Sequence, residues 1–91
     1  MQITDVKIRK TFTEGPMQAV ASVTLDGVFV VHDVKVIAAG DRRFIVMPSR
    51  KNQDGTYRDI AHPITADFRQ ALEEAVLCEY DRVLAENIET V

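Results

Sequence analysis

The sequence predicts an α+β domain in which an antiparallel sheet of four or five strands, arranged as two hairpins, packs against one long C-terminal helix. Three observations support this prediction. Apolar and polar residues alternate through the first half of the chain, an Asp-Gly pair separates two such runs, and apolar residues recur at helical spacing after Pro63. The length of 91 residues leaves room for a single domain, which we assign to residues 1–91.

The first two runs predict two strands. Residues 3–12 alternate with a period of two, although Ile3 is out of phase, so we expect a later start or a bulge near it. A second run extends from Met17 to Leu25 and ends at Asp26-Gly27. An Asp-Gly pair favours a two-residue type I′ turn, because both turn positions need positive φ. The two residues therefore predict a hairpin.

The second strand of this hairpin is expected to run from Val28 to about Ile37. It is apolar on both faces, which indicates a central strand or one that a second copy of the protein covers. If Leu25 pairs with Val28, alternation puts every second residue on one face. We expect a homodimer interface on that face, at Val28, Val30, His32, Val34 and Val36.

Two further short strands are predicted, from Phe44 to Met47 and from Tyr57 to Ala61. Residues 38–43 form a polar turn before the first of them. Pro48 has no backbone donor and is expected to close that strand. Between the two strands lies a polar stretch with an Asp-Gly turn signal at residues 54–55, which we expect to be a loop.

The C-terminal part predicts a helix. Thr65 is suited to the N-cap, and Asp67 places a negative charge in the first turn, where the helix dipole favours it. Arg69 interrupts the apolar face and is expected to extend past the helix start. Cys78 is expected to be a small buried residue, and residues 85–91 are expected to fray. The apolar face comprises Phe68, Leu72, Val76, Tyr80 and Leu84, with Ala75 and Val83 beside them.

Charge is distributed unevenly along the chain. The formal net charge is −3, but residues 1–63 hold nine basic and seven acidic residues, and residues 64–91 hold two and seven. The resulting local charges of +2 and −5 matter more than the total, because the Debye length is only ~8 Å at physiological salt. The single cysteine excludes an internal disulfide, and no apolar run approaches the ~18 residues of a membrane helix. We expect a cytoplasmic protein with no membrane association.

Catalysis and metal binding are poorly supported. The only neighbouring histidine and carboxylate groups are His32-Asp33 and Asp59 with His62, and neither pair has a nucleophile placed beside it. Adjacent strand residues point to opposite faces, so Asp33 cannot orient His32. We therefore expect His32 to be a hydrogen-bonded structural residue and His62 a turn residue. No enzymatic activity, cofactor or metal site is expected.

The basic residues are the better functional candidates. Arg50 and Lys51 are suited to phosphate contacts, with Arg42, Arg43 and Arg58 nearby if the two loops share one rim of the sheet. Asn52 and Gln53 can pair with base edges. The residues alone also allow a simpler interpretation, in which these are solvated charges that protect sheet edges, and they favour that interpretation over nucleic-acid binding.

Four segments resemble the bacterial stage V sporulation protein G (SpoVG) family. They are TDVKIRK at residues 4–10, EGPMQAVASVTLDGVFVVHDVKVI at 14–37, MPSRKNQDGTYRDIAHPI at 47–64 and AVLCEYDRV at 75–83. The resemblance implies a small cytoplasmic α+β homodimer, linked to septation and sporulation control, that binds DNA and RNA as a regulator. It also implies nucleic-acid contacts in the segment from Ser49 to Arg58, where Arg50, Lys51 and Gln53 inherit that role.

Two functional hypotheses follow. In the first, the chain is a dimeric regulator that binds nucleic acid through its basic loop. In the second, it is a protein-interaction module of cell division in which nucleic-acid binding is incidental. The module would act through an acidic helix surface at Glu73, Glu74, Asp81 and Glu86.

Overall fold

The structure is a computed structural model that describes residues 1–89, with side chains for residues 1–86. Its elements are β1 (Ile3–Thr11), β2 (Met17–Leu25), β3 (Phe29–Ala39), β4 (Arg42–Val46), β5 (Ser49–Lys51), β6 (Tyr57–Asp59) and α1 (Ala66–Glu89). The first four strands form one antiparallel sheet in the order β1-β2-β3-β4, and β5 and β6 form a separate two-stranded ribbon. The predicted α+β class is therefore confirmed. One difference is that β5 is a strand in a segment that was predicted to be a loop.

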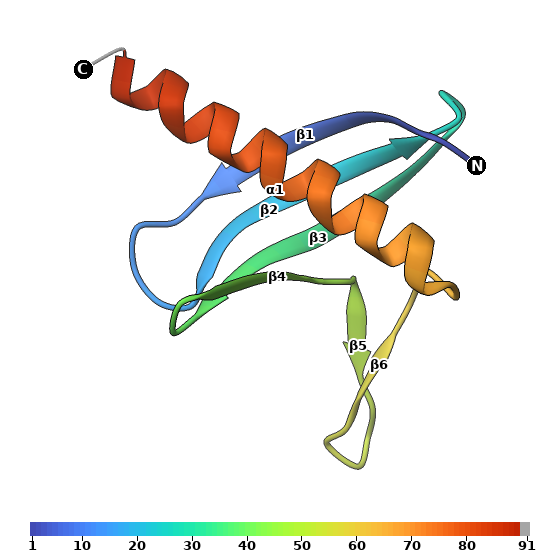
Figure 1. The fold of residues 1–91 in the computed structure, drawn as a ribbon. Coiled ribbons are helices and arrows are strands. Elements are labelled where there is room, and N and C mark those ends of the chain that lie inside the picture. The colour runs from blue at the N-terminus through green and yellow to red at the C-terminus, as the bar shows by residue number, and fades with distance from the viewer. Residues whose placement is uncertain (90–91) are drawn as a thin grey trace.

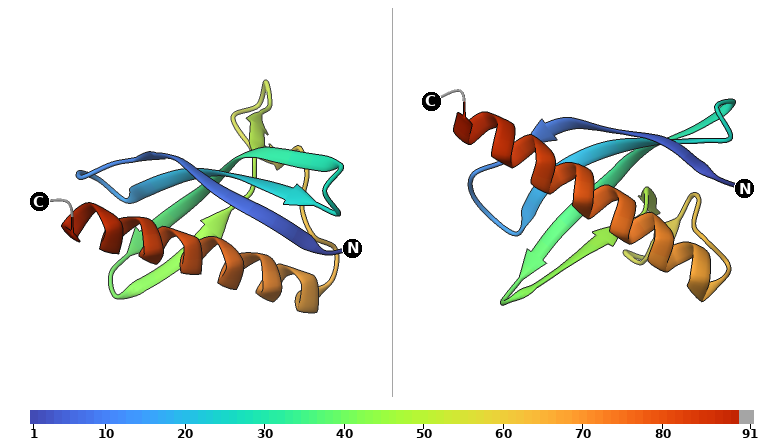
Figure 2. Two further views of the ribbon diagram at one scale, coloured as in Figure 1. Left: turned by 90° about the horizontal axis from the view of Figure 1, so that it is seen from above. Right: turned by 45° about the horizontal axis from the view of Figure 1, so that its top comes forward.

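The molecule has two layers. Helix α1 crosses one face of the four-stranded sheet, as Figure 1 shows. In the part of the chain that the structure describes, no helix covers the opposite face, which we call the free face. The β5–β6 ribbon rises on the side of the free face, away from α1 (Figure 2, left). None of the described helices combines the length and apolarity needed to cross a membrane.

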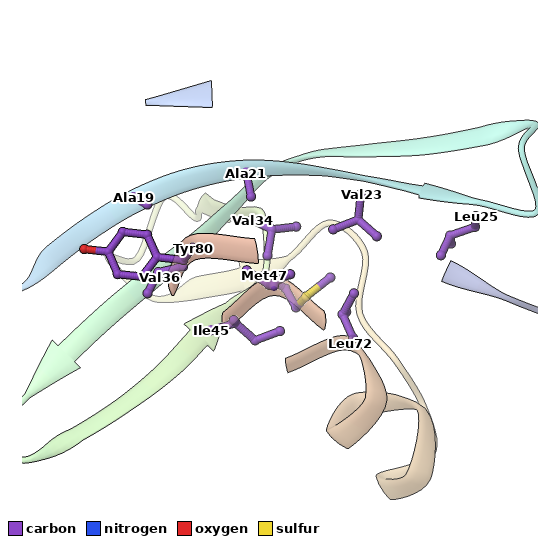
Figure 3. Close-up of a cluster of buried hydrophobic side chains, with 11 residues drawn as sticks. Ala19, Ala21, Val23, Leu25, Val34, Val36, Ile45, Met47, Leu72 and Tyr80 are labelled. Carbon is purple, nitrogen blue, oxygen red and sulfur yellow. The ribbon is translucent and has the colours of Figure 1, made fainter. Parts of the chain in front are cut away.

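The core lies between the sheet and α1 (Figure 3). Alternate residues of β2 face the helix because strand side chains point to opposite faces in turn. The helix contributes every fourth residue to the core, which matches the predicted apolar face. The buried apolar residues are Ala19, Ala21, Val23, Leu25, Val34, Val36, Ile45, Met47, Leu72, Val76 and Tyr80.

The β2–β3 turn has the conformation that Asp-Gly predicts. Asp26 and Gly27 have φ values of 53° and 69°, and the Val28 N–H donates to the Leu25 carbonyl at 3.1 Å. The pairing nevertheless differs from the expected one, because Leu25 lies opposite Phe29 rather than Val28. This shift moves the first half of β3 by one residue relative to β2.

A second irregularity lies in the middle of β3. Val31 pairs with Val23 and Val34 pairs with Ala21, so two residues of β3, His32 and Asp33, stand opposite one residue of β2. This is a β-bulge, and Asp33 adopts a φ of 63° within it. The bulge reverses the one-residue shift made at the turn, so the second half of β3 returns to the expected face.

The prediction that one face carries all five dimer candidates is therefore wrong. Val34 and Val36 are 0% exposed and belong to the core under α1. Val28 and Val30 lie between the turn and the bulge, and both are exposed. The ring of His32 hydrogen-bonds to Ser22 on the free face. The physical reason is that two one-residue irregularities, at the turn and at the bulge, interrupt the regular alternation.

The starts of β1 and α1 have the features predicted for them. A register shift between Ile3 and Asp5 confirms the irregular start of β1. The Thr65 hydroxyl accepts a hydrogen bond from the Phe68 N–H at 3.2 Å, which confirms the N-cap. Arg69, which was expected to extend past the helix start, reaches β4 and donates to the Ile45 carbonyl at 3.4 Å.

The later part of α1 differs in two respects. Leu84 is exposed although it belongs to the predicted apolar face, and Cys78 is exposed rather than buried. Cys78 lies two residues from both Val76 and Tyr80, which puts it on the side of α1 opposite the core, and Leu84 lies one turn beyond Tyr80. The helix continues to Glu89, and the last two residues of the segment expected to fray, 90–91, lie outside the described residues.

Candidate nucleic-acid interface

The segment expected to be a basic loop is an ordered antiparallel ribbon. Arg50 pairs with Arg58, and Lys51 pairs with Tyr57. At its base, the Ile60 N–H donates to the carbonyl of Pro48 at 2.7 Å, just after Met47 enters the core. Because β5 is a strand, alternate residues of the segment point to opposite faces of the ribbon.

One face of the ribbon concentrates positive charge. Arg50 and Arg58 lie directly opposite each other, and both are exposed. Like charges in such a cross-strand pair oppose folding, unlike an Arg–Glu pair in the same position. Of the ion pairs between described residues, none involves Arg50, Lys51 or Arg58. These three side chains therefore remain available for an external anion.

The other face of the ribbon brings Lys51 beside an aromatic ring. Tyr57, its cross-strand partner, is 71% exposed. An exposed aromatic side chain next to a cation suits stacking on bases and contact with phosphate together. Tyr57 was not among the residues predicted to bind nucleic acid. The signal available was its position at the start of the strand that leads into Arg58.

The ribbon tip is closed by its own polar groups. Backbone hydrogen bonds join the Asn52 N–H to the Thr56 carbonyl at 2.7 Å and the Gly55 N–H to the Asn52 carbonyl at 3.1 Å. The Asn52 amide donates to the Thr56 hydroxyl at 3.1 Å. Asp54 accepts from the Thr56 hydroxyl at 2.7 Å and its N–H at 3.1 Å, and these bonds lower the pKa of Asp54. Asn52 is thus occupied in the tip, whereas the side chain of Gln53 is exposed and appears in none of these bonds.

Arg42 and Arg43 do not lie beside the ribbon. They begin β4, whereas the ribbon follows its other end, so about 13 Å of strand separates them at ~3.3 Å per residue (Figure 1). The condition that the two loops share a rim is therefore not met. Arg43 also forms a two-pronged ion pair with Asp81, with N–O distances of 2.6 and 3.0 Å. Its hydrogen bonds hold the pKa of Asp81 below its usual value.

The acidic helix surface is partly neutralised within the chain. Besides the Arg43 pair at Asp81, Arg82 forms ion pairs with Glu79 and Glu86. Glu74 accepts a hydrogen bond from the amide of Gln70 at 3.2 Å. The four acids named for a partner surface therefore do not present four unpaired charges.

The histidines have the structural contacts that the sequence predicted. The Nδ1 atom of His32 lies 2.8 Å from the Ser22 hydroxyl, which also accepts a hydrogen bond from Arg9 Nε at 3.1 Å. His62 Nδ1 lies 3.0 Å from the Pro63 carbonyl. The expectation that His32 is hydrogen-bonded is confirmed.

These features define a class of small α+β domains that expose a basic two-stranded ribbon beside a sheet covered on one face by a single helix. The family model for SpoVG matches residues 1–82, and the chain belongs to the SpoVG family. A relative from Acetivibrio thermocellus is 54% identical over 90 residues, covering 99% of this chain and 96% of its own length. One from Clostridium kluyveri is 54% identical over 91 residues, covering 100% and 93%.

A further relative from Listeria monocytogenes is 53% identical over 83 residues, covering 91% of this chain and 81% of its own length. All three are named SpoVG, and their names assign them provisionally to septation. The resemblance of the four sequence segments to this family is therefore confirmed.

Proposed function

We propose that this protein is a homodimeric regulator that binds DNA, and RNA as a second ligand, through the β5–β6 ribbon. Arg50 directly opposite Arg58, with no ion pair to either among the described residues, is the observation that most supports this function. The major groove of DNA accommodates a two-stranded ribbon, so Gln53 at the tip can reach base edges while the arginines contact phosphates. The names of the relatives support a link to septation, and the roles in gene regulation and sporulation control are proposed from the family resemblance. The single, exposed Cys78 suits a reducing cytoplasm.

The ribbon can be tested with an Arg50→Ala, Lys51→Ala variant. We expect weaker binding to DNA, and the slope of log affinity against log salt should fall in magnitude by about 1.8, because each phosphate contact contributes ~0.9. Fluorescence anisotropy across a salt series measures both quantities. Circular dichroism should show an unchanged fold, because both side chains are exposed.

A matched control is Arg43→Ala, Arg82→Ala, which removes the same charge from side chains that form ion pairs with α1. It should bind as the unchanged protein does. If the ribbon variant also binds normally, the ribbon is not the site, and Arg69 at the helix start becomes the next candidate.

The dimer is proposed to form at the hairpin end of β3. In the described residues, β3 pairs with β4 only from Lys35 to Ala39, so its first half has no strand partner on that side. Exposed apolar residues lie in this half, at Phe29 and Val30, and in the turn just before it, at Val28. An unpaired apolar strand of this kind favours association with a second chain.

We expect light scattering at micromolar concentration to give twice the monomer mass, and a Val30→Lys variant to give the monomer mass. Val30 is 43% exposed, so lysine at this position fits the subunit but places a charge in the proposed interface. A Leu84→Lys variant is the control, because Leu84 is similarly exposed on α1. A monomeric mass for the unchanged protein would contradict the dimer.

The alternative function, docking of a cell-division protein on α1, has a separate test. Glu73 and Glu74 form no ion pair among the described residues, so their charges are available to a partner. Reversal of both charges should abolish septation activity in cells without weakening DNA binding if this alternative holds. Loss of activity in the ribbon variant alone would instead support the proposed regulator.

A further inference from the structure

The free face of the sheet carries basic side chains in register. Ala19 and Ala21 are buried under α1, so Val20 and Ser22 between them point to the free face. Cross-strand partners share a face, and this rule places the partners of these two residues on the free face as well. Lys10 and Lys35 both pair with Val20, from opposite sides, and Lys7 pairs with Ser22.

The two lysines beside Val20 are separated by one strand. At ~4.8 Å between neighbouring strands, β1 and β3 lie about 10 Å apart, so these side chains form two positive positions across the sheet. Lys10 also lies over the ring of Phe12, with its Nζ atom 5.2 Å from the ring centroid. None of these lysines forms an ion pair with a described residue.

A guanidinium is held at the centre of the same face. The register shift between Ile8 and Lys10 is a bulge that contains Arg9, whose Nε donates to the Ser22 hydroxyl at 3.1 Å. Ser22 is only 4% exposed, and its Oγ lies 2.8 Å from Nδ1 of His32. Nε is fixed in this way, and the two terminal nitrogens of Arg9 bond to no described residue, so they can form a fork with a phosphate.

Acidic residues are few on this face. Asp5 pairs with Thr24 near the hairpin end, and Asp33 lies in the β3 bulge. The four basic residues therefore outnumber these two carboxylates. We call the four residues the cationic sheet face: Lys7, Arg9, Lys10 and Lys35.

The ribbon and the cationic sheet face lie on the same side of the molecule. Figure 2 (left) shows β5 and β6 rising from the sheet on the side away from α1. An extended polyanion that contacts Arg50 and Arg58 on the ribbon can therefore also meet the sheet beside it. A protein partner with an acidic patch would need only one of the two surfaces, whereas a nucleic-acid backbone presents charge continuously along its length.

We propose that the cationic sheet face is a second phosphate-binding surface for the DNA duplex that the ribbon holds. The ribbon enters the major groove, and the sheet contacts the phosphate backbone beside that groove. This inference rests on the proposed function. It adds four phosphate contacts on the sheet to those of the ribbon, and it explains why an acidic chain keeps its free face positive.

The test is a Lys10→Gln, Lys35→Gln variant, which removes two charges from one row of the sheet. Binding to a mixed-sequence DNA duplex should weaken, and the salt slope should fall in magnitude by about 1.8, because each lost phosphate contact removes ~0.9. The control is Arg43→Gln, Arg82→Gln, which changes the net charge equally on the α1 side. It should leave both quantities unchanged.

The outcomes separate this inference from the proposed function. If the sheet variant matches the control while the Arg50→Ala, Lys51→Ala variant loses binding, the sheet surface is wrong and the ribbon function stands. If the unchanged protein shows no salt-dependent binding to DNA, both are wrong. If the salt slope of the sheet variant falls in magnitude by about 1.8, the sheet surface is supported, whatever the ribbon variant shows.

Arg9 has a separate test, because a lysine keeps its charge but cannot form the same fork. An Arg9→Lys variant should keep the salt slope and lose several-fold in affinity at fixed salt, since Ser22 no longer fixes the donor pair. Affinity equal to that of the unchanged protein would show that the Arg9–Ser22–His32 arrangement does not position a phosphate contact.

Discussion

A Leu72→Ala variant should lose about 2–5 kcal/mol of unfolding free energy, the range typical of a buried leucine truncated to alanine. Leu72 is 3% exposed and packs between α1 and the sheet, beside Val23 and Met47 (Figure 3). A domain of this length has only about 5–14 kcal/mol of stability at ~0.05–0.15 kcal/mol per residue. The loss is therefore a large share of the total.

The surroundings of Leu72 explain why the loss should not be recovered by relaxation. The side chain lines an apolar pocket of about 390 Å³ that Leu25, Phe29, Val34 and Phe68 also line. Truncation enlarges a space that is already present, so neighbouring side chains gain few new contacts. The cost depends on how far such a site can collapse, and here little collapse is available.

The matched control is Leu84→Ala on the same helix, because Leu84 is 37% exposed. It should change the unfolding free energy by less than ~1 kcal/mol, since little apolar area leaves the core. Urea unfolding followed by circular dichroism measures both variants at one protomer concentration, because stability would depend on concentration in the proposed dimer. Equal losses in the two variants would contradict the assignment of Leu72 to the core.

The sequence predicted those parts of the fold that depend on local patterns. The alternation in β2, the Asp26-Gly27 turn and the Thr65 cap are all signals carried by neighbouring residues, and all three are confirmed. The apolar face of α1, which includes Leu72, was also predicted, because the spacing of apolar residues along a helix shows which side is buried. Its end at Leu84 was missed, because the extent of the sheet beneath the helix is a tertiary property.

For the candidate site, the sequence predicted which basic residues lie close together along the chain better than it predicted their secondary structure. Arg50, Lys51 and Arg58 do share one exposed element, but the sequence gives no sign that three residues suffice for a strand there. The distance of Arg42 from the ribbon and the Arg43–Asp81 ion pair depend on long-range packing that alternation cannot reveal. The cationic sheet face was missed for a similar reason. Lys10 and Lys35 are 25 residues apart in the chain and meet only through the register of β2.

The failure to predict the bulge at Asp33 had the widest effect, because the bulge decides which valines of β3 are buried. Asp is one of the few residue types besides Gly that tolerates positive φ, and His32-Asp33 is the only polar pair within that apolar run. These two facts together were the available signal. A bulge at this position lets Val31 and Val34 both face α1, although they are three positions apart and regular alternation would put them on opposite faces.

An Asp33→Val variant should therefore be less stable by about 1–3 kcal/mol, because a β-branched residue is strained at a φ of 63°. Asp33→Gly should keep or raise the stability, since glycine adopts positive φ without a steric penalty. The control is Asp5→Val, which makes the same chemical change on an exposed residue of β1 that does not have positive φ. It should be neutral or stabilising, because valine favours a strand.

Urea midpoints of the three variants give the comparison, at one protomer concentration. If Asp33→Val and Asp33→Gly have the same stability, the backbone at this position is not in the left-handed region and the bulge is wrong. The Asp33→Val variant can relieve its strain only by straightening β3, which would move His32 away from Ser22.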